Sequence, residues 1–208
     1  MKRFIRWLAA ALLTYSLVPC AYAQTADMKA LLEDMKRGGY VIVFRHGATH
    51  RDQADTDPLN TDNIAKQRLL SEKGKEVAKQ VGDSFKRLGI SFGQVYTSKF
   101  NRAVETGKLV SGGEVTTSAD ITEGGLVVTP IENDRRAEML RKMVAAKPEE
   151  GKNTLIVTHK PNILDAFGKD WFEVKEAEAS VFKPDGSGKS QPMARVQAVD
   201  WIKAAGDN

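Results

Sequence analysis

The stretch VIVFRHGATH, residues 41–50, decides the fold. Its first four residues are apolar without alternation, which is typical of a strand buried on both faces of a parallel sheet. The run then ends in two charged or titratable side chains, Arg45 and His46, and His50 follows four residues later. The chain has three histidines in all, so two of them lie within this one turn. Such a pair at the end of a buried strand indicates a functional site.

Helical and strand patterns alternate along the rest of the chain. Residues 25–39 carry apolar side chains at i, i+3, i+4 and i+7 before a glycine, which predicts an amphipathic helix. We expect further helices at 71–89, 101–110 and 134–146, strands at 94–98 and 153–159, and a terminal hairpin of 177–183 with 193–202. The alternation predicts a three-layer α/β/α sandwich with a mainly parallel central sheet.

Length and charge favour one domain without a nucleic-acid role. A chain of 208 residues that is 41% hydrophobic and 28% charged fits a single globular domain, here residues 24–208. The net charge of +4 comes largely from the first 23 residues, which hold three basic residues and no acid. Without them, 28 basic residues face 27 acidic ones, a net charge of +1. A run of basic residues interleaved with aromatics is also missing from the sequence, so binding to nucleic acid is not expected.

The first 23 residues have the three parts of a secretory signal peptide. A basic start, MKRFIR, precedes the apolar stretch WLAAALLTYSLV, and Ala21 and Ala23 occupy the small positions of an A-x-A cleavage site. The apolar stretch is short for a membrane span, so we expect cleavage after Ala23 and a periplasmic or secreted protein without a stable span. Cys20 raises a lipoprotein alternative, which Pro19 before it disfavours. Since the sole cysteine leaves with the signal, the mature chain has no disulfide.

Four side chains from distant parts of the chain are expected at one edge of the sheet. In open α/β sheets, ligands bind at the carboxyl ends of the strands, beside the helix N-termini that follow. The first parallel strand ends at Arg45 and His46, the second leads to Arg102 at the start of its helix, and the third ends at His159. Two arginines and two histidines therefore converge.

This set of residue types suits the chemistry of phosphate esters. Guanidinium groups grip phosphate oxygens bidentately and keep their charge at any working pH. A neutral imidazole can attack phosphorus, and a second, protonated imidazole can stabilise the charge on the transferred group. Gly47, directly after His46, is expected to leave room for phosphate at the backbone. This chemistry requires neither a metal ion nor a cofactor, and we expect none.

The three motifs at these positions resemble the ordered signature of the histidine phosphatase superfamily, which has the phosphoglycerate mutase-like fold. They are RHG on the first strand, TSKFNRAVET in the middle and VTH on a late strand. The resemblance runs from about Gly39 to Phe182 and points to the small branch of the family. It implies that His46 is the phosphorylated nucleophile, with Arg45, Arg102 and His159 completing the phosphate pocket. It also implies an oxygen contact from Thr49.

The chain departs from two better-known branches of this family. The loop after the first motif lacks the tryptophan and asparagines of glycolytic mutases, and Lys160 stands where the phytase-like branch has an aspartate. The general acid must therefore come from elsewhere. In the smaller branch it is often a glutamate some way after the middle arginine, which implies Glu123. The competing carboxylates are Asp52, Asp55, Asp57, Asp120 and Glu132.

Several roles stay open at this stage. His50 and Arg51 fit a solvated loop and a substrate contact equally well, whereas a structural role is favoured for Gln67 and Arg68. The PDGSGK stretch lacks the spacing of a phosphate-binding loop and is expected to be a hairpin turn. The leading function is a phosphomonoesterase acting on a phosphorylated small molecule or envelope glycan. The alternatives are a catalytically silent phospholigand-binding protein and a protein phosphohistidine phosphatase; the sequence does not predict an oligomeric state.

Overall fold

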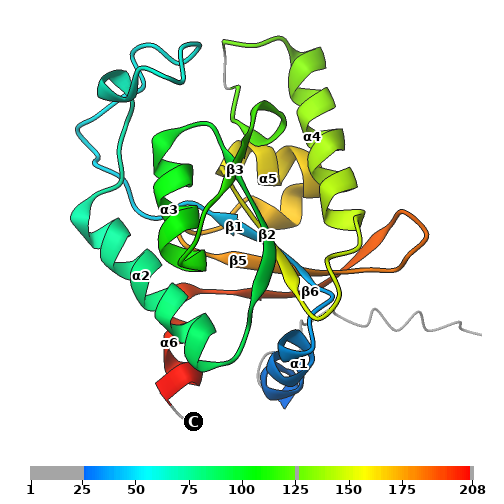
Figure 1. Cartoon of the computed structure of the whole chain (residues 1–208). Coiled ribbons are helices and arrows are strands. Elements are labelled where there is room, and N and C mark those ends of the chain that lie inside the picture. The colour runs from blue at the N-terminus through cyan, green and yellow to red at the C-terminus, as the bar shows by residue number, and fades with distance from the viewer. Residues whose placement is uncertain (1–25, 125–126, 207–208) are drawn as a thin grey trace, which may run out of the picture.

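The computed structural model describes residues 26–124 and 127–206, and the expected signal segment lies outside these ranges. One six-stranded sheet is flanked by helices on both faces (Figure 1). The strands are β1 (Val41–Arg45), β2 (Phe92–Ser98), β3 (Thr116–Ser118), β4 (Asn153–Thr158), β5 (Ala179–Pro184) and β6 (Ser190–Val196). The helices are α1 (Ala26–Lys36), α2 (Glu72–Arg87), α3 (Asn101–Ser111), α4 (Pro130–Ala145), α5 (Lys160–Phe167) and α6 (Ala198–Gly206).

The sheet is mixed, with its parallel part at the positions where the sequence predicts it. The strand order is β3-β2-β4-β1-β5-β6; the first four of these strands are parallel to one another, and β5 runs antiparallel to both β1 and β6. This arrangement confirms the three-layer α/β sandwich. In the β1–β4 ladder, Arg45 is opposite Thr158. The residues that follow these strands, His46 and His159, therefore leave the sheet at the same edge.

Alternating side chains of the central strands build one apolar core on each face of the sheet. Ile42 and Phe44 of β1 face a core shared with α1, α2, α3 and α6, whereas Val41 and Val43 face α4 and α5. All four side chains are fully buried, as expected for a strand covered on both faces. Within the described ranges, no helix is long and apolar enough to cross a bilayer.

The C-terminal hairpin is shorter than the sequence predicts. Strand β6 ends at Val196, and residues 198–202, which the sequence pattern assigns to the same strand, belong to helix α6. Asp200 accepts a hydrogen bond from the backbone N–H of Gln197 at 3.3 Å, which satisfies a donor at the start of this helix. The fully buried Trp201 packs edge-on against Phe85 of α2, with ring centroids 4.8 Å apart. This tertiary packing outweighs the strand-like pattern.

Proline lies in the first turn of two helices whose starts the sequence pattern does not predict. Helix α4 begins at Pro130, four residues before the expected start, and Thr129 caps it by accepting from the N–H of Glu132 at 3.2 Å. Helix α5 was not expected, and it begins directly after His159 with Pro161 in its first turn. Proline is tolerated there because the N–H that it lacks has no partner inside the helix.

The loop after β1 is pressed against the start of α2. The hydroxyl and the backbone N–H of Ser71, the N-cap of α2, both donate to the carbonyl of Ala48, at 3.1 and 3.0 Å. A Cβ added to Gly74 would lie 2.0 Å from that carbonyl oxygen, and one added to Gly47 would lie 2.9 Å from the carbonyl oxygen of Gly74. Close packing against α2 is thus one reason for glycine at position 47, and room for phosphate at its backbone stays a prediction.

We predict that Gly74→Ala destabilises the protein and disturbs the loop that carries His46. The added methyl group must push Ala48 away, and overpacking of this kind costs about 1–3 kcal/mol of unfolding free energy. Urea denaturation measures this loss. Gly113→Ala is the matched control, since nothing lies within 4 Å of its added Cβ. Equal stability of Gly74→Ala and the wild type would contradict the proposed packing constraint.

Candidate active site

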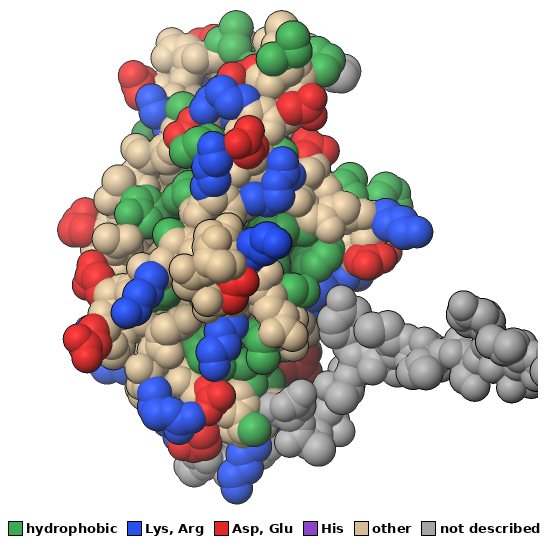
Figure 2. All heavy atoms as spheres, turned by 90° about the vertical axis from the view of Figure 1, so that its right-hand side faces the viewer, with side chains coloured by type: hydrophobic (Ala, Val, Ile, Leu, Met, Phe, Trp, Pro, Cys, Tyr) green, Lys and Arg blue, Asp and Glu red, His purple; other side chains and the backbone are tan. Residues whose placement is uncertain are grey.

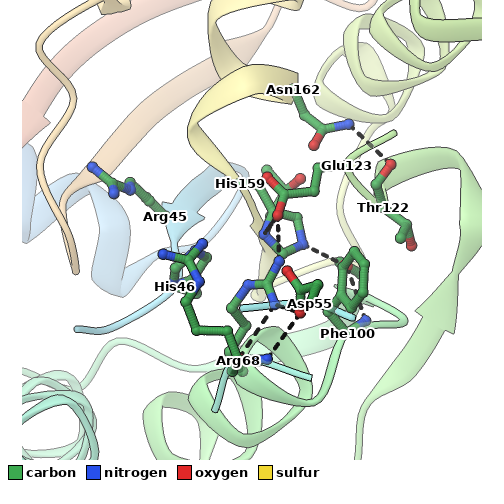
Figure 3. A network of polar contacts seen from close by, with 12 residues as sticks. Arg45, His46, Asp55, Arg68, Phe100, Thr122, Glu123, His159 and Asn162 are labelled. Atoms are coloured by element: carbon green, nitrogen blue, oxygen red, sulfur yellow. Dashed lines mark hydrogen bonds and ion pairs between the residues drawn. The ribbon is translucent and has the colours of Figure 1, made fainter. Parts of the chain in front are cut away.

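Three of the four predicted side chains form a buried cluster at the carboxyl edge of the sheet (Figure 3). His46 follows β1, Arg102 lies in the first turn of α3, and His159 joins β4 to α5. The two imidazole rings are 5.1 Å apart, and Arg102 and His159 are wholly shielded from solvent. The parallel order β2-β4-β1 brings these residues together.

The backbone orients His46. Its Nδ1 lies 2.8 Å from the carbonyl oxygen of Gly47, so the neutral ring carries its proton on Nδ1 and donates it to that carbonyl. The loop itself is held by Thr106, whose hydroxyl accepts from the Gly47 N–H at 3.1 Å and donates to the Arg102 carbonyl at 2.7 Å. Nε2 of His46 is left with its lone pair available.

His159 is fixed by the middle motif. Its Nε2 lies 2.6 Å from the hydroxyl oxygen of Ser98, and this oxygen also accepts from the backbone N–H of Phe100 at 3.1 Å. The serine proton is thereby free to point at Nε2, which would place the ring proton on Nδ1. The His159 ring packs edge-on against Phe100 at 5.5 Å. Nδ1 is buried, has no hydrogen-bond partner among the described residues, and lies 3.7 Å from a carboxylate oxygen of Glu123.

Arg102 joins two loops that are far apart in sequence. Its guanidinium donates to Asp55 at 2.9 Å and also pairs with Glu123, and it lies over the Phe100 ring at 4.3 Å from the centroid. Its Nε is buried without a hydrogen-bond partner among the described residues. Of the six carboxylates considered from the sequence, Asp55 and Glu123 are thus placed at the cluster.

The other candidate acids are held elsewhere by their own partners. Asp57 accepts from the amide of Asn63 at 3.2 Å, and both Asp120 and Glu132 pair with Arg135 at the surface. Asp52 is exposed on a turn. These contacts narrow the choice of a general acid without deciding it.

A short segment positions Glu123. The hydroxyl of Thr158 donates to the Ile121 carbonyl at 2.6 Å, and Arg136 donates to the Thr122 carbonyl at 2.7 Å. The Thr122 hydroxyl accepts from the N–H of Lys99 at 2.9 Å. Strand β4, helix α4 and the end of β2 therefore all hold the segment that directs Glu123 toward Arg102.

Arg45 is placed beside the cluster but is turned outward. Its guanidinium donates to the Val174 carbonyl at 2.7 Å and lies 3.9 Å from Glu176, directed away from the His159 ring (Figure 3). The turn that receives it contains Ala177 at a positive φ of 58°, an uncommon conformation for a residue other than glycine. The N–H of Ala177 contacts the carbonyls of Arg45 and His46, at 3.2 Å each.

A buried ion pair holds that turn. The carboxylate of Glu178, which is 3% exposed, accepts from the Lys175 N–H at 2.9 Å and from Arg195 of β6 at 2.6 and 2.7 Å. The antiparallel edge of the sheet, which carries none of the three motifs, thus fixes the position of Arg45.

A third arginine joins the site, although the sequence favoured a structural role for it. The Arg68 guanidinium points toward the site (Figure 3), where its charge, after burial and Arg102, lowers the pKa of His159, and its backbone N–H donates to Asp55 at 2.9 Å. Its neighbour Gln67 does have the expected structural role, because its side chain joins the Asn101 N–H to the Thr61 carbonyl, at 2.7 Å each. The only hint in the sequence that Arg68 belongs to the site is its positive charge in the loop that follows the first motif.

The remaining predicted contacts lie around the cluster. Thr49 is buried and pairs with Leu70 in an isolated antiparallel bridge, which brings the return of the long loop back to the first motif. His50 lines a separate surface hollow with Lys75 and Glu105, and Arg51 is exposed.

Both imidazoles are held in the neutral form. Burial lowers the pKa of His46 well below its usual value of 6.5, and the nearby His159, Arg102 and Arg45 lower it further. Burial likewise lowers the pKa of His159, with contributions from Arg102, Arg68 and Arg45. A charged second imidazole, as expected from the sequence, is therefore disfavoured in the free protein. A bound dianion would act in the opposite direction.

Comparison with known proteins agrees with this geometry. The model of the histidine phosphatase superfamily (branch 1) matches residues 41–126, which include the first two motifs. This match spans 86 of the 208 residues and ends before the third motif at His159. A search of curated proteins finds no significant match.

Solved structures share the histidine phosphatase fold at low sequence identity. The protein histidine phosphatase SixA complexed with tungstate is 17% identical with a TM-score of 0.52, covering 77% of this chain and 97% of its own. Phosphoserine phosphatase from Entamoeba histolytica in complex with 3-phosphoglyceric acid is 16% identical with a TM-score of 0.54, covering 77% and 98%. A mycobacterial glucosyl-3-phosphoglycerate phosphatase is 16% identical with a TM-score of 0.52, covering 74% and 97%.

We predict that the two buried histidines make this protein lose stability in acid. Unfolding returns each imidazole to a pKa near 6.5, so in acid the unfolded chain binds more protons than the folded protein does. The unfolding free energy should fall by about 2 kcal/mol between pH 6 and pH 5 from these two groups together. Urea titrations at both pH values measure the fall. His159→Gln should halve this contribution, and an unchanged slope in that variant would contradict the assignment.

Proposed function

We propose that the protein is a metal-independent phosphomonoesterase of the small branch that acts through a phosphohistidine at His46. The observation that carries the proposal is the hydrogen bond from Nδ1 of His46 to the Gly47 carbonyl. It directs the lone pair of Nε2 away from the backbone, in a buried site that also holds Arg102, Arg68 and His159. A neutral imidazole beside fixed positive charges is suited to attack a phosphate dianion.

In the first step, Nε2 of His46 attacks phosphorus and the bond from phosphorus to the ester oxygen breaks. The guanidiniums of Arg102 and Arg68, and that of Arg45 once it turns inward, stabilise the charge on the transferred oxygens. His159 donates to an oxygen of the transferred group from its buried Nδ1, which has no partner in the part of the chain that the structure describes. Glu123 acts as the general acid in its protonated form, once the phosphate dianion has replaced it as the partner of Arg102, and gives its proton to the leaving oxygen.

In the second step, water attacks the phosphohistidine. The bond between phosphorus and Nε2 breaks, Glu123 accepts a proton from the water, and inorganic phosphate leaves. Asp55 is assigned a holding role, because it is engaged by both Arg102 and the Arg68 backbone N–H. His46 and Glu123 thus return to their starting states without a metal ion or a cofactor.

The proposed substrate is a phosphorylated small molecule or an envelope glycan. Structural relatives named for phosphoserine and for glucosyl-3-phosphoglycerate support a small-molecule phosphatase. The relative named as a protein histidine phosphatase keeps phosphohistidine on a protein as the second candidate. A silent binding protein is less well supported, since Nε2 of His46 is available for attack. The basic and apolar N-terminal segment supports export to the periplasm or medium.

An aryl phosphate assay in the presence of a chelator tests this proposal. Hydrolysis should persist, and vanadate should inhibit it as a mimic of five-coordinate phosphorus. His46→Ala should abolish turnover and still bind phosphate, whereas Arg102→Ala should weaken binding by about ten- to a hundredfold, the loss of a charge-assisted hydrogen bond. His50→Ala, in the same loop but outside the cluster, is the matched control and should keep full activity. Wild-type turnover by His46→Ala would refute the nucleophile.

The role of Glu123 has its own signature in the same assay. Glu123→Gln should be slowed by about a hundredfold or more with a poor leaving group such as an alkyl phosphate, because general acid catalysis is lost. It should be slowed much less with a nitrophenyl leaving group, which needs no proton. Equal effects on the two substrates would assign the acid to another residue.

A further inference from the structure

Large exposed apolar side chains gather around the candidate active site. Seven such side chains occur in the parts of the chain that the structure describes, and five lie on the three segments that border the site. These five are Leu59, Ile64, Val127, Ile131 and Phe172, and the other two are Met193 and Val199. The four aliphatic members, Leu59, Ile64, Val127 and Ile131, are called the aliphatic rim below.

The first loop exposes large aliphatic side chains as well as charged ones. Gln53 accepts from the Leu69 N–H at 2.9 Å, and Asp55 accepts from Arg68 and Arg102, whereas Arg51, Asp52, Asp62 and Lys66 are exposed. Beside these charges, Leu59 is 74% exposed and Ile64 is 48% exposed. Folding alone does not favour such exposure, because apolar surface is stabilised by removal from water.

The second loop, described at residues 122–124 and 127–131, also engages polar side chains and exposes aliphatic ones. The Thr129 hydroxyl caps α4, and Glu132 is paired with Arg135 and Arg136. Ile131, next to this cap, is 81% exposed, and Val127 is 47% exposed.

The two loops stand over the same buried arginine. Leu59 lies four residues after Asp55, Val127 lies four residues after Glu123, and both carboxylates contact Arg102. In Figure 1 both loops lie at the top of the molecule, and Figure 2 shows hydrophobic side chains gathered at that end. The aliphatic rim therefore lies on the two segments whose carboxylates contact Arg102.

We propose that the aliphatic rim binds the hydrocarbon chain of a long-chain alkyl or polyprenyl phosphate monoester. This inference rests on the proposed phosphatase function and assigns its substrate class. With the phosphate held at Arg102 and His46, the leaving group must extend outward between the two loops. Aliphatic side chains there favour a chain of methylene and methyl groups, because contact between the two removes apolar surface from water.

Hydrolysis of a series of alkyl phosphates tests the proposal. We expect kcat/KM to rise about tenfold from butyl to octyl phosphate below the micellar concentration. Full burial of the four added methylenes would give roughly 200-fold, and exposed side chains bury them only in part. Glycerol phosphate and glucose phosphate should resemble butyl phosphate or be slower. A flat dependence on chain length, or a preference for the sugar phosphate, would overturn the proposal.

Paired variants separate the rim from general surface effects. Leu59→Ser with Ile131→Ser should remove most of the preference for octyl phosphate and leave butyl phosphate nearly unchanged. Met193→Ser with Val199→Ser makes the same chemical change at exposed side chains of β6 and α6, and it should keep the wild-type preference. Equal behaviour of the two double variants would contradict a role for the rim.

A binding measurement keeps this test independent of catalysis. Calorimetry with octylphosphonate and butylphosphonate on His46→Ala protein should show tighter binding of the longer chain, lost in the rim variant. Equal affinities would overturn the substrate class even if aryl phosphates are hydrolysed. Failure of all phosphate esters to turn over, with the chain-length preference in binding intact, would instead refute the catalytic proposal alone.

Discussion

The buried guanidinium of Arg102 is the group on which the rest of the site depends. A charge without solvent contact is very unfavourable unless it is paired, and Arg102 obtains its partners from two loops that are far apart in sequence, through Asp55 and Glu123. Phe100 adds its ring face at 4.3 Å. The same contacts that compensate this charge therefore bring both long loops over the carboxyl edge of the sheet and place a carboxylate next to His159.

This arrangement explains how one site can combine a neutral nucleophile with strong positive charge. Arginine keeps its charge in a buried place, whereas the histidines there lose theirs, because burial and the neighbouring guanidiniums lower both pKa values. The pocket thus separates the two tasks by residue type: guanidiniums hold an anion, and imidazoles remain free to attack or donate. A bound phosphate dianion would offset the excess positive charge, so affinity for that ligand follows from the composition of the pocket.

The convergence of His46, Arg102 and His159 was predictable because it depends on regular structure. Three apolar runs end in these motifs, and parallel strands with right-handed crossovers bring such ends to one edge. Arg68 was missed as a site residue because its loop has no periodicity, and its path is fixed by contacts with Arg102 and by the bridge from Thr49 to Leu70.

Other features of the site depend on packing that no local pattern encodes. The outward turn of Arg45 depends on the distant Glu178–Arg195 pair, and the neutral state of His159 depends on its complete burial. Local alternation predicts a strand where helix α6 lies. The packing of Trp201 against Phe85 favours the helix, and the local pattern does not reveal this contact. The sequence thus predicts which elements meet at the edge, while side-chain direction and charge state follow from the folded core.

The most direct test of the account is the position of the phosphate on a trapped intermediate. Protein quenched during turnover with a labelled phosphate ester and examined by phosphorus and nitrogen NMR should carry an acid-labile phosphate on Nε2 of His46. The Nδ1 atom is committed to the Gly47 carbonyl and should carry none. A phosphate on Nδ1, on another residue, or on no residue at all while hydrolysis proceeds would contradict the mechanism derived from this site.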